Sequence, residues 1–300
     1  MFPFLIPPHD DHATMTITTR FAPSPTGALH LGHAYAARFA ATHGTRFLVR
    51  IEDIDSARCK AEYEATIFSD LAWLGLRWEE PVLRQSTRLE AYGAALAQLK
   101  AQGLLYPCFC TRAEIAAEIA RSGSAPHGPD GPLYPGSCRA LSVEVRAARI
   151  AAGEPYALRL DSTKAAAQAG PLSFVEEGEG ETGRITVDPL CFGDVVLARK
   201  DTPSAYHLAV VVDDAFQGVT LVTRGKDLFA ATHIQRLLQA LLGLPEPAYA
   251  HHKLILDAAG KKFSKRDHAV TLQALRQGGA SPADITALFQ DSDRAMISRR

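Results

Sequence analysis

Residues 20–33 run Arg-Phe-Ala-Pro-Ser-Pro-Thr-Gly-Ala-Leu-His-Leu-Gly-His, and this stretch decides the fold. An apolar-alternating run at residues 16–22 leads into it, and an alanine-rich run with helical spacing at residues 31–41 follows. Prolines and a glycine break the segment between the two runs. The pattern predicts a strand, a loop and a helix whose first turn, holding His30 and His33, offers free backbone N–H groups to a phosphate.

A basic segment, Lys-Lys-Phe-Ser-Lys-Arg, occupies residues 261–266, far downstream of the first motif. It follows an apolar run at residues 254–256, for which we predict a strand. A run of charges is either a solvated surface or a cationic clamp for a triphosphate. Because Gly32 leaves room for a nucleotide at the predicted helix start, the two segments together favour the clamp.

The two segments resemble the HIGH and KMSKS signatures of the class I aminoacyl-tRNA synthetases. His30-Leu31-Gly32-His33 is similar to the first signature and Lys262-Phe263-Ser264-Lys265-Arg266 to the second. The resemblance narrows to the glutamyl branch through residues 20–27, 50–55, 206, 210–214 and 222–225. It covers nearly all of residues 18–267. The fold it implies is α/β, a Rossmann-like doubly wound parallel sheet with a zinc-containing insertion.

The resemblance also implies the site residues. Those expected to be catalytic are His30, His33 and Lys265. The ATP-binding set is His30, Gly32, His33, Lys262, Ser264 and Lys265, with Mg²⁺ accompanying the ATP. The glutamate-binding set is Arg20, Phe21, Ala22, Pro23, Ser24, Glu52, Tyr206 and Arg224. Within it, Glu52 is expected to meet the α-amino group, while Arg20 and Arg224 supply the two cations that a buried dicarboxylate needs.

Further elements follow from periodicity. We predict strands at residues 46–51, 206–212 and 219–222, with the acids Asp213 and Asp214 at a strand end on the ligand-binding rim. Amphipathic patterns predict helices at residues 62–76, 88–102 and 234–242, and a short helix capped by Ser281 near the end. We expect Asp161 and Asp194 to be loop carboxylates, and Cys191 to be buried and inert.

The chain has five cysteines, an odd number that favours a reduced, cytosolic setting and metal binding over a disulfide framework. Cys108, Cys110 and Cys138 supply three thiolates, and structural zinc takes four ligands. The residue pattern leaves His127 or Tyr134 as the fourth ligand, with three free thiols as the alternative. The family resemblance favours Tyr134, through a Cys-x-Cys and Tyr-x-x-x-Cys pairing, and implies one structural Zn²⁺.

The composition fits a globular chain of 300 residues, 47% hydrophobic, with a formal charge of −1 that does not itself indicate a nucleic-acid partner. No apolar run is long enough for a membrane span, and the start lacks the features of a signal peptide. We predict a disordered or misassigned leader at 1–14, with Met15 as an alternative start. The predicted catalytic domain comprises 15–105 and 191–250, split by a zinc-binding, tRNA-facing insertion at 106–190. The predicted remainder, 251–300, holds the KMSKS-like loop and a short helical tail without an anticodon-binding domain.

This organisation resembles the catalytic-core paralogues of the glutamyl branch that glutamylate queuosine in the anticodon of tRNA(Asp). The implied reaction activates L-glutamate with ATP in the absence of tRNA and then transfers it to queuosine. A truncated synthetase that charges a tRNA 3′ end, another kind of nucleotidyltransferase, and a silent RNA- or partner-binding module remain alternatives. We expect a cytoplasmic monomer whose partners are ATP, L-glutamate and queuosine-containing tRNA(Asp).

Overall fold

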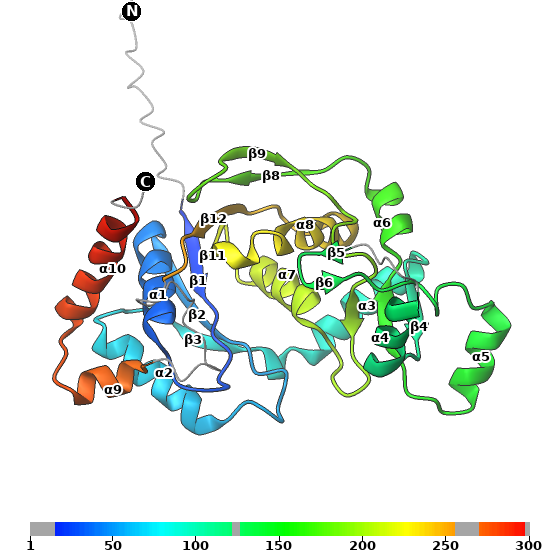
Figure 1. Ribbon diagram of the computed structural model, residues 1–300, viewed down its shortest axis with the longest axis horizontal. Coiled ribbons are helices and arrows are strands. Elements are labelled where there is room, and N and C mark those ends of the chain that lie inside the picture. Colours follow the sequence, from blue (N-terminus) through cyan, green and yellow to red (C-terminus); the bar gives the residue numbers. More distant parts are fainter. Residues whose placement is uncertain (1–15, 122–126, 256–269, 298–300) are drawn as a thin grey trace, which may run out of the picture.

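The computed structural model describes residues 16–121, 127–255 and 270–297, with side chains described up to residue 289 (Figure 1). The predicted leader and the basic segment at 261–266 lie outside the described residues. Ten α-helices lie in the described part of the chain. They are α1 (Leu31–His43), α2 (Ala61–Trp73), α3 (Leu89–Ala101), α4 (Arg112–Arg121), α5 (Val143–Ala151), α6 (Ser162–Ala169), α7 (Tyr206–Phe216), α8 (Ala231–Leu242), α9 (Leu272–Gln277) and α10 (Pro282–Ile297).

Parallel strands form the centre of the molecule. One sheet has the order β1 (Thr18–Phe21), β2 (Arg46–Ile51), β3 (Glu79–Arg84), and all three strands are parallel. A second sheet has the order β11 (Leu221–Gly225), β12 (Ala248–His252), β8 (Ser173–Glu176), β9 (Gly183–Thr186), of which the first three are parallel and the last is antiparallel. The predicted α/β fold with a parallel sheet is therefore confirmed.

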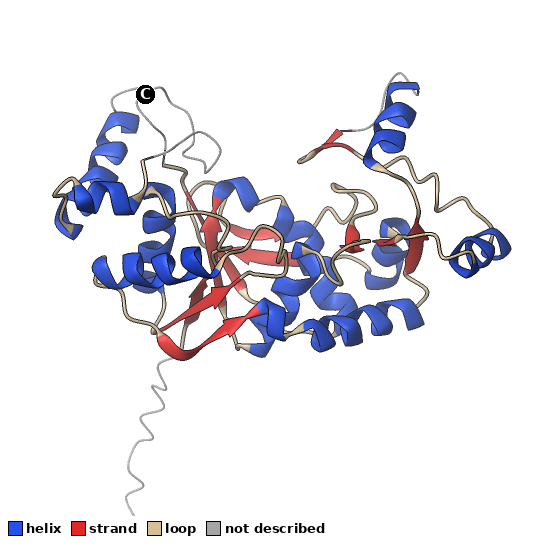
Figure 2. Cartoon of the chain, turned by 90° about the horizontal axis from the view of Figure 1, so that it is seen from below, coloured by secondary structure: helices blue, strands red, loops and turns tan. Residues whose placement is uncertain are grey.

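The two sheets meet edge to edge at β1 and β11. The backbone N–H of Thr220 donates to the carbonyl of Thr18 at 3.0 Å, and the backbone N–H of Thr18 donates to Oγ1 of Thr220. Strand order therefore runs outward in both directions from this junction, and helices lie on both sides of the strands (Figure 2). Doubly wound sheets bind ligands at the carboxyl ends of the strands beside such a switch point.

A smaller antiparallel sheet lies beyond α7 and α8. It has the order β10 (Val196–Ala198), β7 (Ala157–Leu160), β4 (Leu105–Cys108), and a short hairpin of β5 (His127–Gly128) and β6 (Gly131–Pro132) lies in the same region. Asp194 is buried here and accepts from the Tyr106 hydroxyl at 2.6 Å and the Ser162 hydroxyl at 2.8 Å. Asp161 caps α6. Both acids were expected to be simple loop carboxylates, and the structure corrects this, because each organises its neighbours.

The prediction of a strand at 206–212 is wrong, because these residues begin α7. The run Val210-Val211-Val212 is β-branched and apolar, which favours a strand locally. However, α7 is buried over most of its surface, and a short apolar run cannot distinguish a strand from a buried helix. The strand expected at 254–256 is also misplaced, since β12 ends at His252 and residue 256 lies outside the described part.

The other predicted elements are confirmed within a few residues at their ends. They are β1, β2, β11, α1, α2, α3 and α8. The helix predicted after Ser281, whose hydroxyl accepts from the backbone N–H of Asp284, is also present, but α10 has 16 residues and is not short as expected. Cys191 is half-buried rather than buried, and burial raises the pKa of its thiol to about 11. None of the helices in the described ranges combines the length and apolar character needed to cross a bilayer.

Candidate active site

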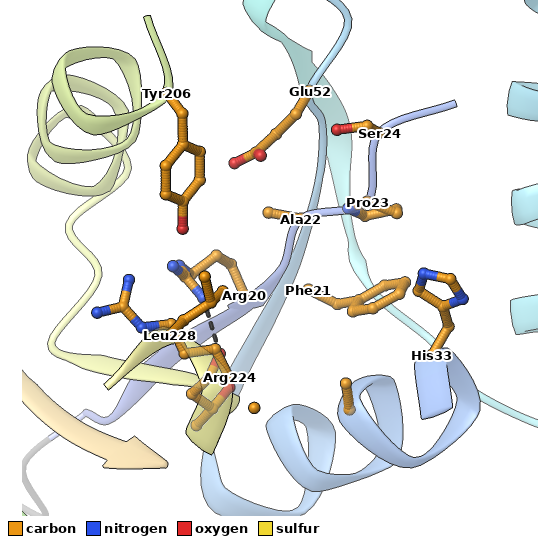
Figure 3. Close-up of a pocket in the computed structure, with 13 residues that line it drawn as sticks. Arg20, Phe21, Ala22, Pro23, Ser24, His33, Glu52, Tyr206, Arg224 and Leu228 are labelled. Carbon is orange, nitrogen blue, oxygen red and sulfur yellow. Dashed lines mark hydrogen bonds between the residues drawn. The ribbon is translucent and has the colours of Figure 1, made fainter. Parts of the chain in front are cut away.

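A cavity of about 470 Å³ opens at the carboxyl ends of β1, β2 and β11, at the switch point between the two sheets. The loop after β1 forms one wall, the start of α7 another, and the first turns of α1 a third (Figure 3). Its lining includes every residue predicted to bind glutamate, namely Arg20, Phe21, Ala22, Pro23, Ser24, Glu52, Tyr206 and Arg224, together with His33.

Two histidines fix the start of α1. His30 is the N-cap, and its Nδ1 accepts from the backbone N–H of Gly32 at 3.1 Å. Nδ1 of His33 accepts from the backbone N–H of His30 at 3.2 Å, which completes a reciprocal capping box. Because both Nδ1 atoms accept, each neutral ring carries its proton on Nε2. The two rings, 3.8 Å apart between centroids, are thereby held as donors at the positive end of a helix.

Arg20 is buried, and three N–H donors of its guanidinium group bind acceptors within the protein. Nε and Nη2 donate to the two carboxylate oxygens of Asp214 at 2.9 and 3.3 Å, and Nη1 donates to the carbonyl of Thr223 at 2.9 Å. A guanidinium has five N–H donors. These bonds use three, so two donors of Arg20 are available to a ligand in the cavity. Asp214 therefore lies within α7 as the partner of Arg20, and not on a strand end as predicted.

Glu52 belongs to the same charge network. Arg50, which is fully buried, donates from Nη1 to Asp214 at 2.7 Å and from Nη2 to Glu52 at 3.3 Å. Burial raises the pKa of Glu52, and the charges of Arg50 and Arg20 only partly oppose it. A cationic group in the cavity would favour the ionised form of Glu52, which suits it to an ammonium ligand.

Arg224 contrasts with Arg20, because the groups that hold it are neutral. Its Nη1 donates to Oε1 of Gln235 at 2.6 Å, its Nη2 to the hydroxyl of Thr232 at 2.7 Å, and its Nε to Nε2 of His251 at 3.0 Å. Arg224 is 6% exposed and forms no ion pair with any residue in the described part of the chain. Its charge is thus left for an anion in the cavity.

Figure 3 shows how these groups are arranged. The hydroxyl of Tyr206 points toward the two arginines at one end of the cavity, and the carboxylate of Glu52 enters from another wall. His33 lies beyond the ring of Phe21. Two cations, one carboxylate and a phenol around a cavity can bind a dicarboxylate that also carries an ammonium group, next to a helix start that can hold phosphate.

The predicted metal ligands also meet. Sulfur atoms of Cys108, Cys110 and Cys138 all lie within 4.8 Å of one another. The Tyr134 hydroxyl lies 3.5 Å from the sulfur of Cys108 and 3.5 Å from that of Cys110. In a tetrahedron with Zn–S bonds of about 2.3 Å the ligand atoms are about 3.8 Å apart, so this set fits zinc.

The pKa of the Cys138 thiol reflects the hydrogen-bonding groups around it. Burial raises its pKa, but hydrogen bonds from Tyr134 and from the backbone N–H of Phe109 outweigh burial and lower that pKa to about 7. Within the described residues, the cluster able to hold a metal contains the three cysteines and does not include His127, which lies on β5. Of the two candidates for the fourth ligand, Tyr134 is therefore the one that lies beside the thiols.

The sequence and the structure differ most over the residues behind the cavity. Arg20, Glu52, Tyr206 and Arg224 come together as predicted, whereas Lys262, Ser264 and Lys265 lie outside the described residues. The roles of all these residues stay predictions. Sequence reasoning missed Thr232, Gln235 and His251, which hold Arg224, and Glu176, which holds His251; it placed Asp214 at a strand end and missed its contact with Arg20. A histidine at the carboxyl end of the strand before the basic segment was the available signal for His251.

Comparisons with known proteins show which proteins this chain resembles. The curated relatives include the Glutamyl-Q tRNA(Asp) synthetase of Rhodobacter capsulatus, 52% identical over 281 residues that cover 90% of this chain and 99% of the relative. The Glutamyl-Q tRNA(Asp) synthetase of Nocardia farcinica is 47% identical over 277 residues, covering 91% of this chain and 83% of the relative.

A solved structure of similar fold is the glutamate tRNA ligase from Elizabethkingia meningosepticum in complex with its amino acid. It has a TM-score of 0.68 and 30% identity, and the match covers 84% of this chain and 52% of the ligase. This chain therefore spans about half of the ligase. Residues 16–290 match the family tRNA synthetases class I (E and Q), catalytic domain, and the chain belongs to that family.

Proposed function

We propose that this enzyme activates L-glutamate with ATP in the absence of tRNA and transfers the glutamate to the queuosine base in the anticodon of tRNA(Asp). The observation that carries the proposal is the charge pattern of the cavity, in which Arg20 and Arg224 face Glu52, in a chain 52% identical to a Glutamyl-Q tRNA(Asp) synthetase over 99% of that relative. This pattern matches glutamate, which has two carboxylates and one ammonium group.

Glutamate binding follows from the groups that line the cavity. We assign the ammonium group to Glu52, whose buried carboxylate gains a cationic partner. The side-chain carboxylate is assigned to Arg224, which lacks an ion pair among the described residues, with the Tyr206 hydroxyl beside it. The two remaining donors of Arg20 contribute to the same end of the cavity. Each buried charge of the ligand then has a partner, as burial requires.

The first chemical step is adenylate formation. An oxygen of the α-carboxylate attacks the α-phosphorus of ATP, the bond to the β-phosphate oxygen breaks, and pyrophosphate leaves. His30 and His33 donate from Nε2 at the start of α1, where charge develops on the α-phosphate. Gly32 keeps the backbone there open to the nucleotide. Lys262, Ser264 and Lys265 remain the proposed clamp for the triphosphate and its Mg²⁺. No covalent enzyme intermediate is needed, because orientation of the two substrates supplies much of the acceleration.

The second step has a direct test. A queuosine hydroxyl attacks the mixed anhydride and AMP leaves. We expect radiolabelled glutamate to transfer to queuosine-containing tRNA(Asp), and also to the same tRNA after removal of its 3′-terminal adenosine, because the acceptor is in the anticodon. The matched substrate is tRNA(Asp) that lacks queuosine, which should accept no label. Transfer that requires the 3′ adenosine and ignores queuosine would replace this proposal with 3′-end charging.

We also propose one structural zinc ion held by Cys108, Cys110, Tyr134 and Cys138, which would tie β4 to the loop before α5. Elemental analysis of purified protein should give one zinc per chain. Because Tyr134 completes the tetrahedron, Y134F should bind zinc about tenfold or more weakly in competition with a chromogenic chelator. H127A is the matched control and should bind zinc as the unmodified protein does. The reverse ranking of the two variants would assign the fourth ligand to His127.

ATP and tRNA are both abundant in the bacterial cytoplasm, which is where we propose that the enzyme acts. The monomeric state expected from the sequence stays a prediction.

A further inference from the structure

Behind Arg224 lies a buried chain of hydrogen bonds that the proposed reaction does not itself use. His251, at 1% exposure, accepts from Arg224 through Nε2 at 3.0 Å, and its Nδ1 lies 2.6 Å from Oε2 of Glu176. Glu176 is 2% exposed and ends β8, while His251 lies near the end of β12. These two hydrogen bonds therefore link Arg224, which lines the cavity, to the carboxylate of Glu176 through the imidazole of His251.

The hydrogen bonds determine the tautomer of His251. Nε of Arg224 can only donate, so Nε2 of His251 must accept and carries no proton. The proton is therefore on Nδ1, from which it is donated to Glu176. Burial, with the charge of Arg224, outweighs the hydrogen bond and the charge of Glu176 and lowers the pKa of His251, which keeps the ring neutral. Burial would raise the pKa of Glu176, but the hydrogen bonds from His251 outweigh burial and lower it, so Glu176 is ionised.

We propose that Glu176 and His251 are positioning residues for glutamate recognition: Glu176 fixes the tautomer of His251, and His251 orients Arg224 through a neutral acceptor. This inference rests on the proposed function, because Arg224 is assigned there to the side-chain carboxylate. A direct carboxylate partner would also orient Arg224, but it would neutralise the charge that the substrate needs. A neutral imidazole, with Gln235 and Thr232, orients the guanidinium and leaves its charge available, which favours glutamate over glutamine.

The variant E176Q tests the tautomer with little change of shape. Oε1 of Glu176 accepts from the backbone N–H groups of His251 at 2.8 Å and Gly178 at 2.9 Å. In E176Q the amide oxygen must stay with these two donors, so the amide NH₂ faces Nδ1 of His251. The ring must then take the other tautomer. Its Nε2–H would face the Nε–H of Arg224, so two donors would meet and the hydrogen bond would be lost.

We expect E176Q to raise the KM for glutamate in ATP–pyrophosphate exchange by about tenfold or more, while kcat changes by less than about threefold. The KM for ATP should not change. The matched control is Y249F, on the same strand, which removes the buried hydrogen bond between Gln239 and the Tyr249 hydroxyl (2.9 Å) but keeps the ring that lies parallel to His251 and 5.6 Å from Arg224. Y249F should keep the KM for glutamate within about twofold of the unmodified enzyme. Equal KM shifts in both variants, or none in E176Q, would overturn the inference.

A second variant tests the role of charge. Oε1 of Gln235 lies 2.6 Å from Nη1 of Arg224, and Q235E keeps this acceptor while adding a carboxylate. We expect kcat/KM for glutamate, divided by kcat/KM for glutamine, to fall by about tenfold or more, because Arg224 then has an ion pair within the protein. An unchanged ratio in a folded Q235E enzyme would contradict the claim that neutral partners preserve the charge.

Long-range ¹H–¹⁵N NMR of the unmodified protein tests the mechanism without relying on any variant's activity. We expect the His251 ring to be neutral with the proton on Nδ1, and in E176Q to carry it on Nε2. The His251 signals are identified by their absence in H251Q. An imidazolium, or an Nε2–H tautomer in the unmodified protein, would overturn the inference. If the unmodified enzyme showed no glutamate-dependent exchange, the proposed function would fail while this NMR result would still stand.

Discussion

Replacing Arg224 with glutamine is expected to raise the KM for L-glutamate in ATP–pyrophosphate exchange by about 100-fold or more, with the KM for ATP unchanged. Arg224 is buried, its protein partners are Thr232, Gln235 and His251, and its charge has no acid beside it among the described residues. Loss of the cation would leave the substrate carboxylate with only the two remaining donors of Arg20, whose charge Asp214 already balances, and this costs about 3 kcal/mol or more. Steady-state exchange over a range of glutamate concentrations measures the effect.

The matched control for R224Q is R46Q. Arg46 pairs with Glu79 on the surface, with side chains 44% and 45% exposed, on β2 of the neighbouring sheet and outside the lining of the cavity. It should leave both KM values unchanged, because exposed ion pairs of this kind contribute little. A KM for glutamate in R224Q within about threefold of that of the unmodified enzyme would contradict the assignment of Arg224 to the side-chain carboxylate.

Replacing Asp214 with asparagine is expected to lower the free energy of unfolding by about 3–5 kcal/mol at pH 7. Asp214 is the acid that pairs with both Arg20 and Arg50, at 2.9 and 2.7 Å, and all three side chains are buried. Without it Arg50 keeps its ion pair with Glu52, and Arg20 has no ion pair among the described residues. Urea unfolding followed by circular dichroism measures the change. E79Q, which breaks an exposed pair, should leave the free energy of unfolding nearly unchanged.

The carboxylate of Asp214 should also make the free energy of unfolding depend on pH. The charges of Arg20 and Arg50, and their hydrogen bonds, outweigh burial and hold the pKa of Asp214 below its ordinary value. A group whose folded-state pKa is depressed contributes stability that is fully present above the unfolded pKa, about 3.9, and is lost as the pH falls through the folded pKa. The stability difference between the unmodified protein and D214N should therefore shrink below about pH 4 and be constant from pH 5 to 8. A difference that grew in acid would contradict this assignment.

The parts of the fold that the sequence predicted well are determined locally. The strand, loop and helix around residues 16–43 follow from alternating apolar residues, loop prolines and an N-cap, all close together in the chain. The residues of the cavity lining were predicted through the family resemblance, and the positions of Glu52 and Arg224 also follow from the rule that side chains at the carboxyl ends of parallel strands meet at one edge of a sheet. The pattern at 206–212 failed because burial on nearly all sides removes the periodicity that distinguishes a helix from a strand.

The groups that hold the two arginines depend on contacts between distant segments. Asp214 meets Arg20 across 194 positions of sequence, and Glu176 meets His251 across 75. Nothing local to Asp214 indicates that its carboxylate turns inward from a helix. Likewise, a glutamate at the end of β8 is an ordinary surface residue until β12 lies beside it. Such buried polar networks become predictable only once the order of the strands is known.

The measurement that tests the central claim most directly is ATP–pyrophosphate exchange with purified protein, L-glutamate, ATP and Mg²⁺, after treatment with ribonuclease to remove all tRNA. We expect exchange that depends on glutamate and is far weaker with glutamine or aspartate. This result would mean that the cavity between β1 and β11 forms glutamyl-adenylate on its own. Exchange that appears only when tRNA(Glu) is added, or that does not depend on glutamate, would contradict the account.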